Sequence, residues 1–146
     1  MKIIVHSILV IILASCSSKL ENRVNELIEN KNKWVKSAQN SNYSYTRIIK
    51  CACKLHDKRM IIKVLNGKVV SAKFENGKKY TIESTKTIKQ HFEFVFENLK
   101  REEQEGDVTL DVEYNKKLGY PSLISINIKN KTHGRAIFLI SNVVLQ

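Results

Sequence analysis

Apolar residues recur along this chain with two different periods, and these periods predict its secondary structure. Residues 19–38 and 85–101 carry apolar residues at helical spacing, so we expect a helix in each segment. Other segments alternate apolar and polar residues or form short apolar runs, as β-strands do. The predicted strands cover residues 43–53, 60–65, 68–74, 108–114, 121–128 and 136–145, with residues 78–82 as a further short strand or an arm.

The connections between the predicted strands are short, and this sets the direction of pairing. Asn66-Gly67 is a strong hairpin signal, because both central residues of a type I′ turn need positive φ. Strands joined in this way pair antiparallel. We therefore expect an α+β fold, with an antiparallel sheet of about six strands and the two helices packed on one of its faces.

One face of the first predicted strand contains a charged residue. Tyr43, Tyr45, Ile49 and Cys51 alternate on this face, and Arg47 interrupts them. The last strand, residues 136–145, is the most apolar, which favours a central place in the sheet.

The N-terminus has the pattern of an export signal. Lys2 precedes an apolar run from Ile3 to Leu13, which is too short for the roughly 20 residues that span a bilayer. Leu13-Ala14-Ser15-Cys16 then resembles the bacterial lipobox, which implies that Cys16 is lipidated and becomes the first residue of the mature chain. An ordinary signal peptide followed by a chance cysteine is the alternative interpretation.

This interpretation divides the chain into three parts. Residues 1–15 are the expected signal peptide, and residues 16–30 are the lipidated cysteine with a tether that runs into the first helix. Residues 31–146 are the expected single domain, of a size that can enclose one core.

The same interpretation predicts a location in the bacterial cell envelope. Several acyl chains on Cys16 would hold the chain stably at a membrane, with the domain outside the cytoplasm. Ser17 stands where Asp resembles an inner-membrane retention signal, which favours the outer membrane if the host is Gram-negative.

The composition is basic, with a formal net charge of +11. For an exported protein this points to anionic lipid headgroups or wall polymers as neighbours, and we expect no nucleic acid. The favoured explanation of the charge is that scattered lysines simply keep the surface soluble.

Cys51 and Cys53 form the most distinctive pair of reactive residues. In a flat strand, side chains two residues apart are separated by about 6.6 Å, whereas disulfide Cβ atoms lie about 3.8 Å apart. A disulfide would therefore need a bulge or a chain reversal at Ala52. Such a tight ring would be readily reduced.

Two other interpretations of the cysteines stay open. In the first, both pack as small apolar groups. In the second, they form with His56 a Cys-x-Cys-x-x-His sequence suited to Cu(I) or Zn(II), with His91 or His133 as a distant fourth ligand.

No signature of an enzyme is present in the sequence. It has no Gly-x-Ser-x-Gly, no His-Glu-x-x-His and no phosphate-binding glycine loop. We interpret His56, His91 and His133 as surface or capping residues. We therefore expect neither an enzymatic activity nor a cofactor.

A series of short landmarks occurs in an order that suggests a family. They are Trp34, Asn42-Tyr43-Ser44-Tyr45, Cys51-Ala52-Cys53, Val64 to Ala72, Phe92 and Phe96, Tyr114, Gly119-Tyr120-Pro121-Ser122 and the isoleucine-rich strand. This order resembles the bacterial exported family called domain of unknown function 6174. The resemblance implies a small lipoprotein or secreted domain and brings no catalytic residue with it. The chain departs from the pattern after the isoleucine-rich strand, where basic residues such as Lys129 and Arg135 replace the expected acidic ones.

Together these features predict a non-enzymatic envelope lipoprotein. Its domain would present the open sheet face or a sheet edge to another envelope protein, a peptide or an anionic polymer. The alternative is a thiol-redox or soft-metal (copper or zinc) protein that acts through Cys51, Cys53 and His56.

Overall fold

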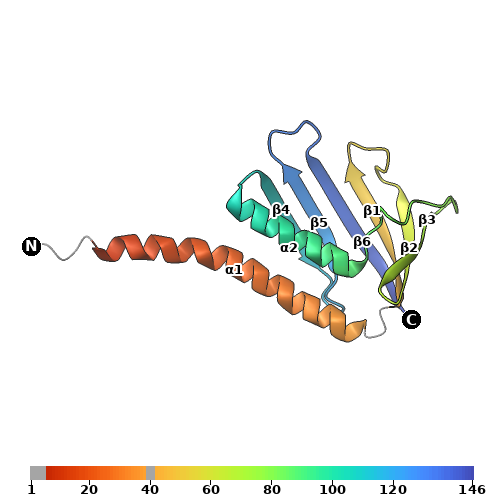
Figure 1. Ribbon diagram of the computed structural model, residues 1–146, viewed down its shortest axis with the longest axis horizontal. Helices are drawn as coiled ribbons and strands as arrows, with labels where there is room; N and C mark the ends of the chain where they lie inside the picture. Colours follow the sequence, from red (N-terminus) through yellow and green to blue (C-terminus); the bar gives the residue numbers. More distant parts are fainter. Residues whose placement is uncertain (1–5, 39–41) are drawn as a thin grey trace, which may run out of the picture.

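The computed structural model describes residues 6–38 and 42–146, and for residues 6–18 it describes the backbone alone. Residues 1–5 of the expected signal peptide, its remaining side chains and the side chain of Cys16 therefore lie outside the description. The elements follow the order α1 (His6–Ser37), β1 (Tyr43–Cys51), β2 (Arg59–Leu65), β3 (Lys68–Phe74), α2 (Ile88–Gln104), β4 (Val108–Tyr114), β5 (Pro121–Ile128) and β6 (Arg135–Leu145), as Figure 1 shows.

All six strands form one sheet in the order β3-β2-β1-β6-β5-β4, and every neighbouring pair is antiparallel. Both helices lie on the same side of this sheet (Figure 1). The predicted α+β fold is therefore confirmed. The last strand, β6, pairs with β1 in the middle of the sheet, as its apolar sequence predicts.

Local sequence signals account for most of these elements. Asn66 and Gly67 have φ values of 50° and 72°, so the turn between β2 and β3 is the predicted hairpin. On β2, Met60, Ile62 and Val64 are buried and the residues between them are exposed. This alternation directs one face of β2 into the core.

Helix α2 begins three residues later than the predicted segment, because Thr87 caps it. The Thr87 side chain accepts a hydrogen bond from the Gln90 amide, and the Gln90 side chain accepts one from the Thr87 amide. The amide of Ile88 donates to the Tyr43 hydroxyl at 2.9 Å. The bond to Tyr43 attaches the start of α2 to β1.

Helix α1 is attached to the sheet by aromatic side chains. Trp34 is buried, and its ring meets the rings of Tyr43 and Tyr120 edge to face, with centroids 5.0 and 6.2 Å away. Leu27 is buried in the same core, and Leu20 and Val24 pack against it. Segment 16–30 is thus helical, and from Leu20 onward it contributes to the packing. Within residues 6–38 and 42–146, no helix combines the length and the apolar character needed to cross a membrane.

Candidate functional site

The face of the sheet opposite the helices carries an apolar patch. Pairing across the strands places Ile48 beside Leu139 and Leu139 beside Leu123. Ile61 and Ile137 occupy the same face, on β2 and β6, and Ile61 is 49% exposed. We call these five residues the open-face patch. It crosses the four strands β2, β1, β6 and β5 at the centre of the sheet.

Opposite charges lie on the two sides of the open-face patch. On one side, β2 and β3 present exposed Arg59, Lys63 and Lys73 on the same face, and Arg59 pairs with Glu75. On the other side, β4 presents exposed Asp111 and Glu113. A partner that covers the patch therefore meets a basic flank and an acidic flank, which fix its orientation.

The β4 edge of the sheet is bridged by helix α1. The Arg23 guanidinium donates a hydrogen bond to the Leu110 carbonyl and forms an ion pair with Glu102 of α2 at 2.7 Å. A carbonyl of the edge strand is therefore already bonded within the chain. Since strand addition needs such groups to be free, this contact disfavours it at β4.

The β3 edge is covered by the segment that follows it. The Phe74 amide donates to the Lys78 carbonyl at 2.9 Å, and the Tyr80 amide donates to the Ala72 carbonyl at 2.8 Å. Residues 78–80 therefore return along the strand as an arm, one of the two forms expected for residues 78–82. Of the surfaces predicted for partner binding, the open face is better exposed than either edge.

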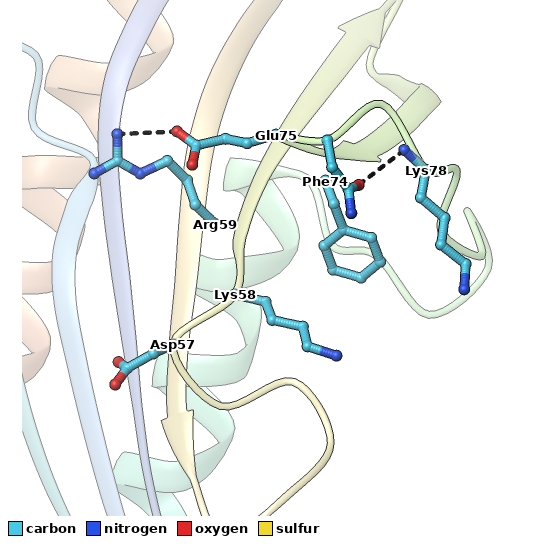
Figure 2. Close-up of a pocket in the computed structure, with 7 residues that line it drawn as sticks. Asp57, Lys58, Arg59, Phe74, Glu75 and Lys78 are labelled. Carbon is cyan, nitrogen blue, oxygen red and sulfur yellow. Dashed lines mark hydrogen bonds and ion pairs between the residues drawn. The ribbon is translucent and has the colours of Figure 1, made fainter.

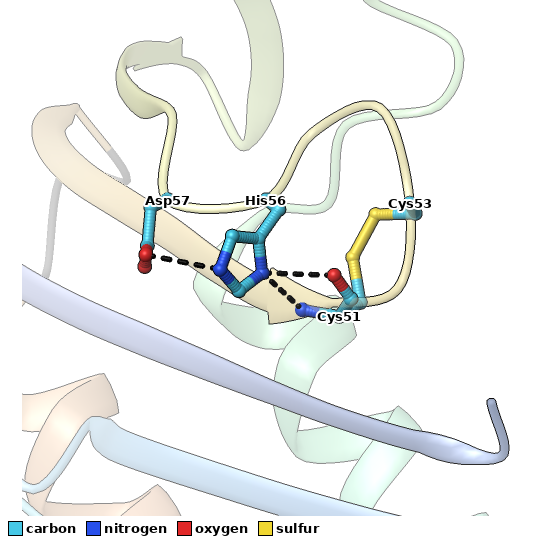
Figure 3. The surroundings of a disulfide bond; sticks show 4 residues. All are labelled: Cys51, Cys53, His56 and Asp57. Carbon is cyan, nitrogen blue, oxygen red and sulfur yellow. Dashed lines mark hydrogen bonds and ion pairs between the residues drawn. A yellow bond between two sulfur atoms is a disulfide. The ribbon is translucent and has the colours of Figure 1, made fainter.

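Cys51 and Cys53 are joined by a disulfide at the end of β1 (Figure 3). The prediction that β1 continues to Cys53 is wrong, because the strand ends at Cys51 and the chain turns at Ala52. This turn brings the two Cα atoms to 5.3 Å. Cys53 is exposed and Cys51 is half-buried, so the bond is open to reagents.

His56 lies beside this disulfide, but both of its ring nitrogens are engaged (Figure 3). Its Nδ1 atom is 2.8 Å from the Cys51 carbonyl oxygen, and its Nε2 atom is 3.1 Å from Oδ2 of Asp57. The imidazole therefore connects the two ends of the loop, at Cys51 and Asp57. In the part of the chain that the structure describes, no three His, Cys, Asp or Glu side chains are placed to hold a metal.

His91 and His133 lie in environments that differ from that of His56. His133 is exposed in the loop after β5, as expected. The interpretation of His91 as a surface or capping residue is wrong, because this side chain is only 1% exposed beneath α2. Its spacing from Ile88 and Val95 on the buried face of α2 was the available signal.

Arg47 and His91 are two buried polar residues between β1 and α2. Arg47 is 4% exposed, on the core-facing side of β1. Burial lowers the pKa of the Arg47 guanidinium. Burial, with smaller contributions from the positive charges of Arg47 and Lys86, lowers the pKa of His91 to about 3. His91 is therefore neutral at physiological pH.

A surface pocket of about 460 Å³ lies between the start of β2 and the end of β3 (Figure 2). Lys58 lies over the Phe74 ring, with its amine 5.8 Å from the centroid, and Arg59 pairs with Glu75 at 3.3 Å. The lining mixes both signs of charge, so it favours no single class of ligand.

The comparison with protein families agrees with the order of landmarks in the sequence. Residues 26–144 match the Family of unknown function (DUF6174). The chain belongs to this family. The match begins within α1 and ends within β6, so the DUF6174 region includes α2 and the first five strands complete. Comparisons with curated proteins and with solved structures each found no match.

Proposed function

We propose that this chain is a bacterial envelope lipoprotein whose DUF6174 domain binds another envelope protein through the open face of its sheet. The apolar run and the lipobox-like Leu13-Ala14-Ser15-Cys16 support lipid attachment at Cys16. The domain would then act at the membrane without catalysing a reaction.

The observation that carries this proposal is the open-face patch. An apolar surface that crosses four strands between charged flanks is typical of a protein-binding site. Burying such a surface contributes roughly 25 cal/mol per Å² before the entropic costs of association. Because the segment after β3 pairs along one edge and Arg23 already bonds a carbonyl of β4 at the other, the face is the better candidate.

In-cell photo-crosslinking tests this surface. A photoreactive amino acid at Ile61, in the open-face patch, is expected to give an adduct with a distinct envelope protein. The same group at Glu97, exposed on α2 behind the sheet, is the matched control and is expected to give none. Equal yields from both positions, or no adduct from Ile61, would contradict the proposal.

The lipid anchor is tested in the same experiment. With Cys16→Ser, the chain is expected to leave the membrane fraction, and the Ile61 adduct should fall about tenfold as the local concentration drops. If the Cys16→Ser variant stays in the membrane fraction, the anchoring part alone is overturned.

A second candidate function is supported by the exposed disulfide. A dithiol partner would attack Cys53, form a mixed disulfide and release the Cys51 thiolate. Completion of the exchange transfers two electrons and two protons to Cys51 and Cys53 and leaves the partner as a disulfide. This chemistry needs an external dithiol and no metal.

Redox titration tests this second function. We expect a glutathione buffer that leaves buried structural disulfides intact to reduce Cys51–Cys53, as measured by alkylation and intact mass. A Cys51→Ser, Cys53→Ser double variant should lose only about 1–2 kcal/mol of stability, because the closed loop is so short. A bond that resists this buffer, or a double variant that unfolds, would identify a structural disulfide instead.

A further inference from the structure

Arg47 is a buried cation without an acidic partner among the described residues. Its Nη2 atom donates to the sulfur of Met60 at 3.5 Å, and a thioether is a weak acceptor. Its Nε atom is buried and has no hydrogen-bond partner. No ion pair of Arg47 occurs within residues 19–38 and 42–146, whose side chains the structure describes.

His91 adds two more unpaired polar atoms at the same place. Its ring lies edge-on to Tyr45, with centroids 6.3 Å apart, and 6.3 Å from the ring of Phe138. Both ring nitrogens are buried without a partner. Tyr45 and Arg47 lie two residues apart on the same face of β1, so His91 packs on the residue that neighbours Arg47 along this face.

The charges that act on His91 are positive. Arg47 and Lys86 both act on His91, which lies in the first turn of α2, where the helix dipole is also positive. An unpaired buried donor is destabilising, and an unpaired buried charge is more so. An anion would satisfy Arg47 and one nitrogen of His91 together.

We propose that Arg47 and His91 bind a small monovalent anion between β1 and the first turn of α2. The site goes beyond the proposed protein-binding function and lies on the opposite side of the sheet. Tyr45 and Phe138 pack against His91, and Met60 contacts Arg47, so the room beside the two polar groups suits only a halide or a small carboxylate. The unbranched Met60 side chain can shift to admit an ion close to the volume of one water molecule, about 30 Å³.

Anion-dependent stability tests the site. The full chain, purified in a nonionic detergent, is unfolded in urea at constant ionic strength while bromide replaces a bulky organic sulfonate. A second titration uses formate in place of bromide. We expect the unfolding midpoint to rise and saturate with bromide, with formate or with both.

Matched variants separate binding from a general salt effect. Arg47→Met is expected to abolish the saturable rise, whereas Arg135→Met, which removes an exposed arginine, should retain it. The same response in all three proteins, or no response to either anion, would overturn the proposal. If Arg47→Met fails to fold, crystals of the unmodified protein grown with bromide decide the question. An anomalous peak beside Arg47 supports the site, and its absence rejects it.

Discussion

Replacing Gly119 with alanine is expected to lower the free energy of unfolding by about 2–4 kcal/mol, from the combined costs of overpacking and left-handed backbone. Gly119 lies at φ +81°, in the turn between β4 and β5. A Cβ atom there would lie 2.4 Å from the Asn30 carbonyl oxygen and 2.9 Å from the Lys33 Cβ atom. Both contacts are with α1, so the helix would have to move away from the sheet.

Gly77 provides a matched control for this prediction. It has the same φ of +81°, but a Cβ atom added to it meets nothing within 4 Å. Gly77→Ala should therefore cost only the backbone strain, about 1 kcal/mol. Urea unfolding of the full chain, followed by the fluorescence of Trp34, measures both variants. Equal losses at the two positions would show that the contact of this turn with α1 contributes nothing.

The contact at Gly119 also shows that local sequence patterns do not predict the packing between distant elements. Local patterns predicted α1 and the turn after β4 separately, because helical spacing and turn residues are read within short windows. Their packing joins Gly119 to Asn30 and Lys33, which are 89 and 86 positions away, and no local pattern specifies such a contact. The same limit applies to the bond from Arg23 to the Leu110 carbonyl.

Position was a better guide than residue type at the two buried polar residues. Arg47 alternates with Tyr45 and Ile49 on the buried face of β1, and His91 follows Ile88 by one helical turn. The alternation along the strand and the spacing along the helix therefore placed these two side chains in the core. The usual surface preference of charged and imidazole groups led to the wrong prediction for His91.

The sequence also contained a signal for the open-face patch, in the apolar run of β6. Residues 136–140 are continuously apolar, so β6 must present apolar side chains on both of its faces. A helix covers only one of those faces in the structure. The central place of β6 was predicted, but the uncovered Ile137 and Leu139 could be recognised only after the layers were known.

The stability of the chain is expected to fall as the pH decreases from 6.5 to 3, in part because of His91. Burial next to Arg47 and Lys86 lowers the pKa of His91 from 6.5 to about 3 in the folded protein. Between these values the unfolded chain binds a proton at this position and the folded chain does not. The contribution of His91 is therefore complete above pH 6.5, decreases by about 1.4 kcal/mol per pH unit through this window, and is lost below about pH 3.

Comparison with two variants isolates this contribution from the carboxylates that titrate in the same range. His91→Met has a similar volume and no titratable group, so the difference in unfolding free energy between wild type and variant should change across the window. His133→Asn removes an exposed imidazole at φ +66°, a conformation that Asn tolerates, and should keep the wild-type slope. Urea unfolding of the full chain at several pH values measures all three proteins, with a bulky organic sulfonate as the only anion.

The anion site makes this prediction more specific. A bromide ion beside Arg47 would oppose the positive charges that act on His91 and would make its protonation easier in the folded state. The pH slope of the wild type should therefore be smaller in bromide than in sulfonate, whereas His91→Met should show no such difference. If wild type and His91→Met have the same slope in sulfonate, the burial of His91 does not control acid unfolding. In a third outcome, the slopes of wild type and His91→Met differ in sulfonate while the wild-type slope stays the same in bromide. That result would support a buried, neutral His91 and would argue against the anion site.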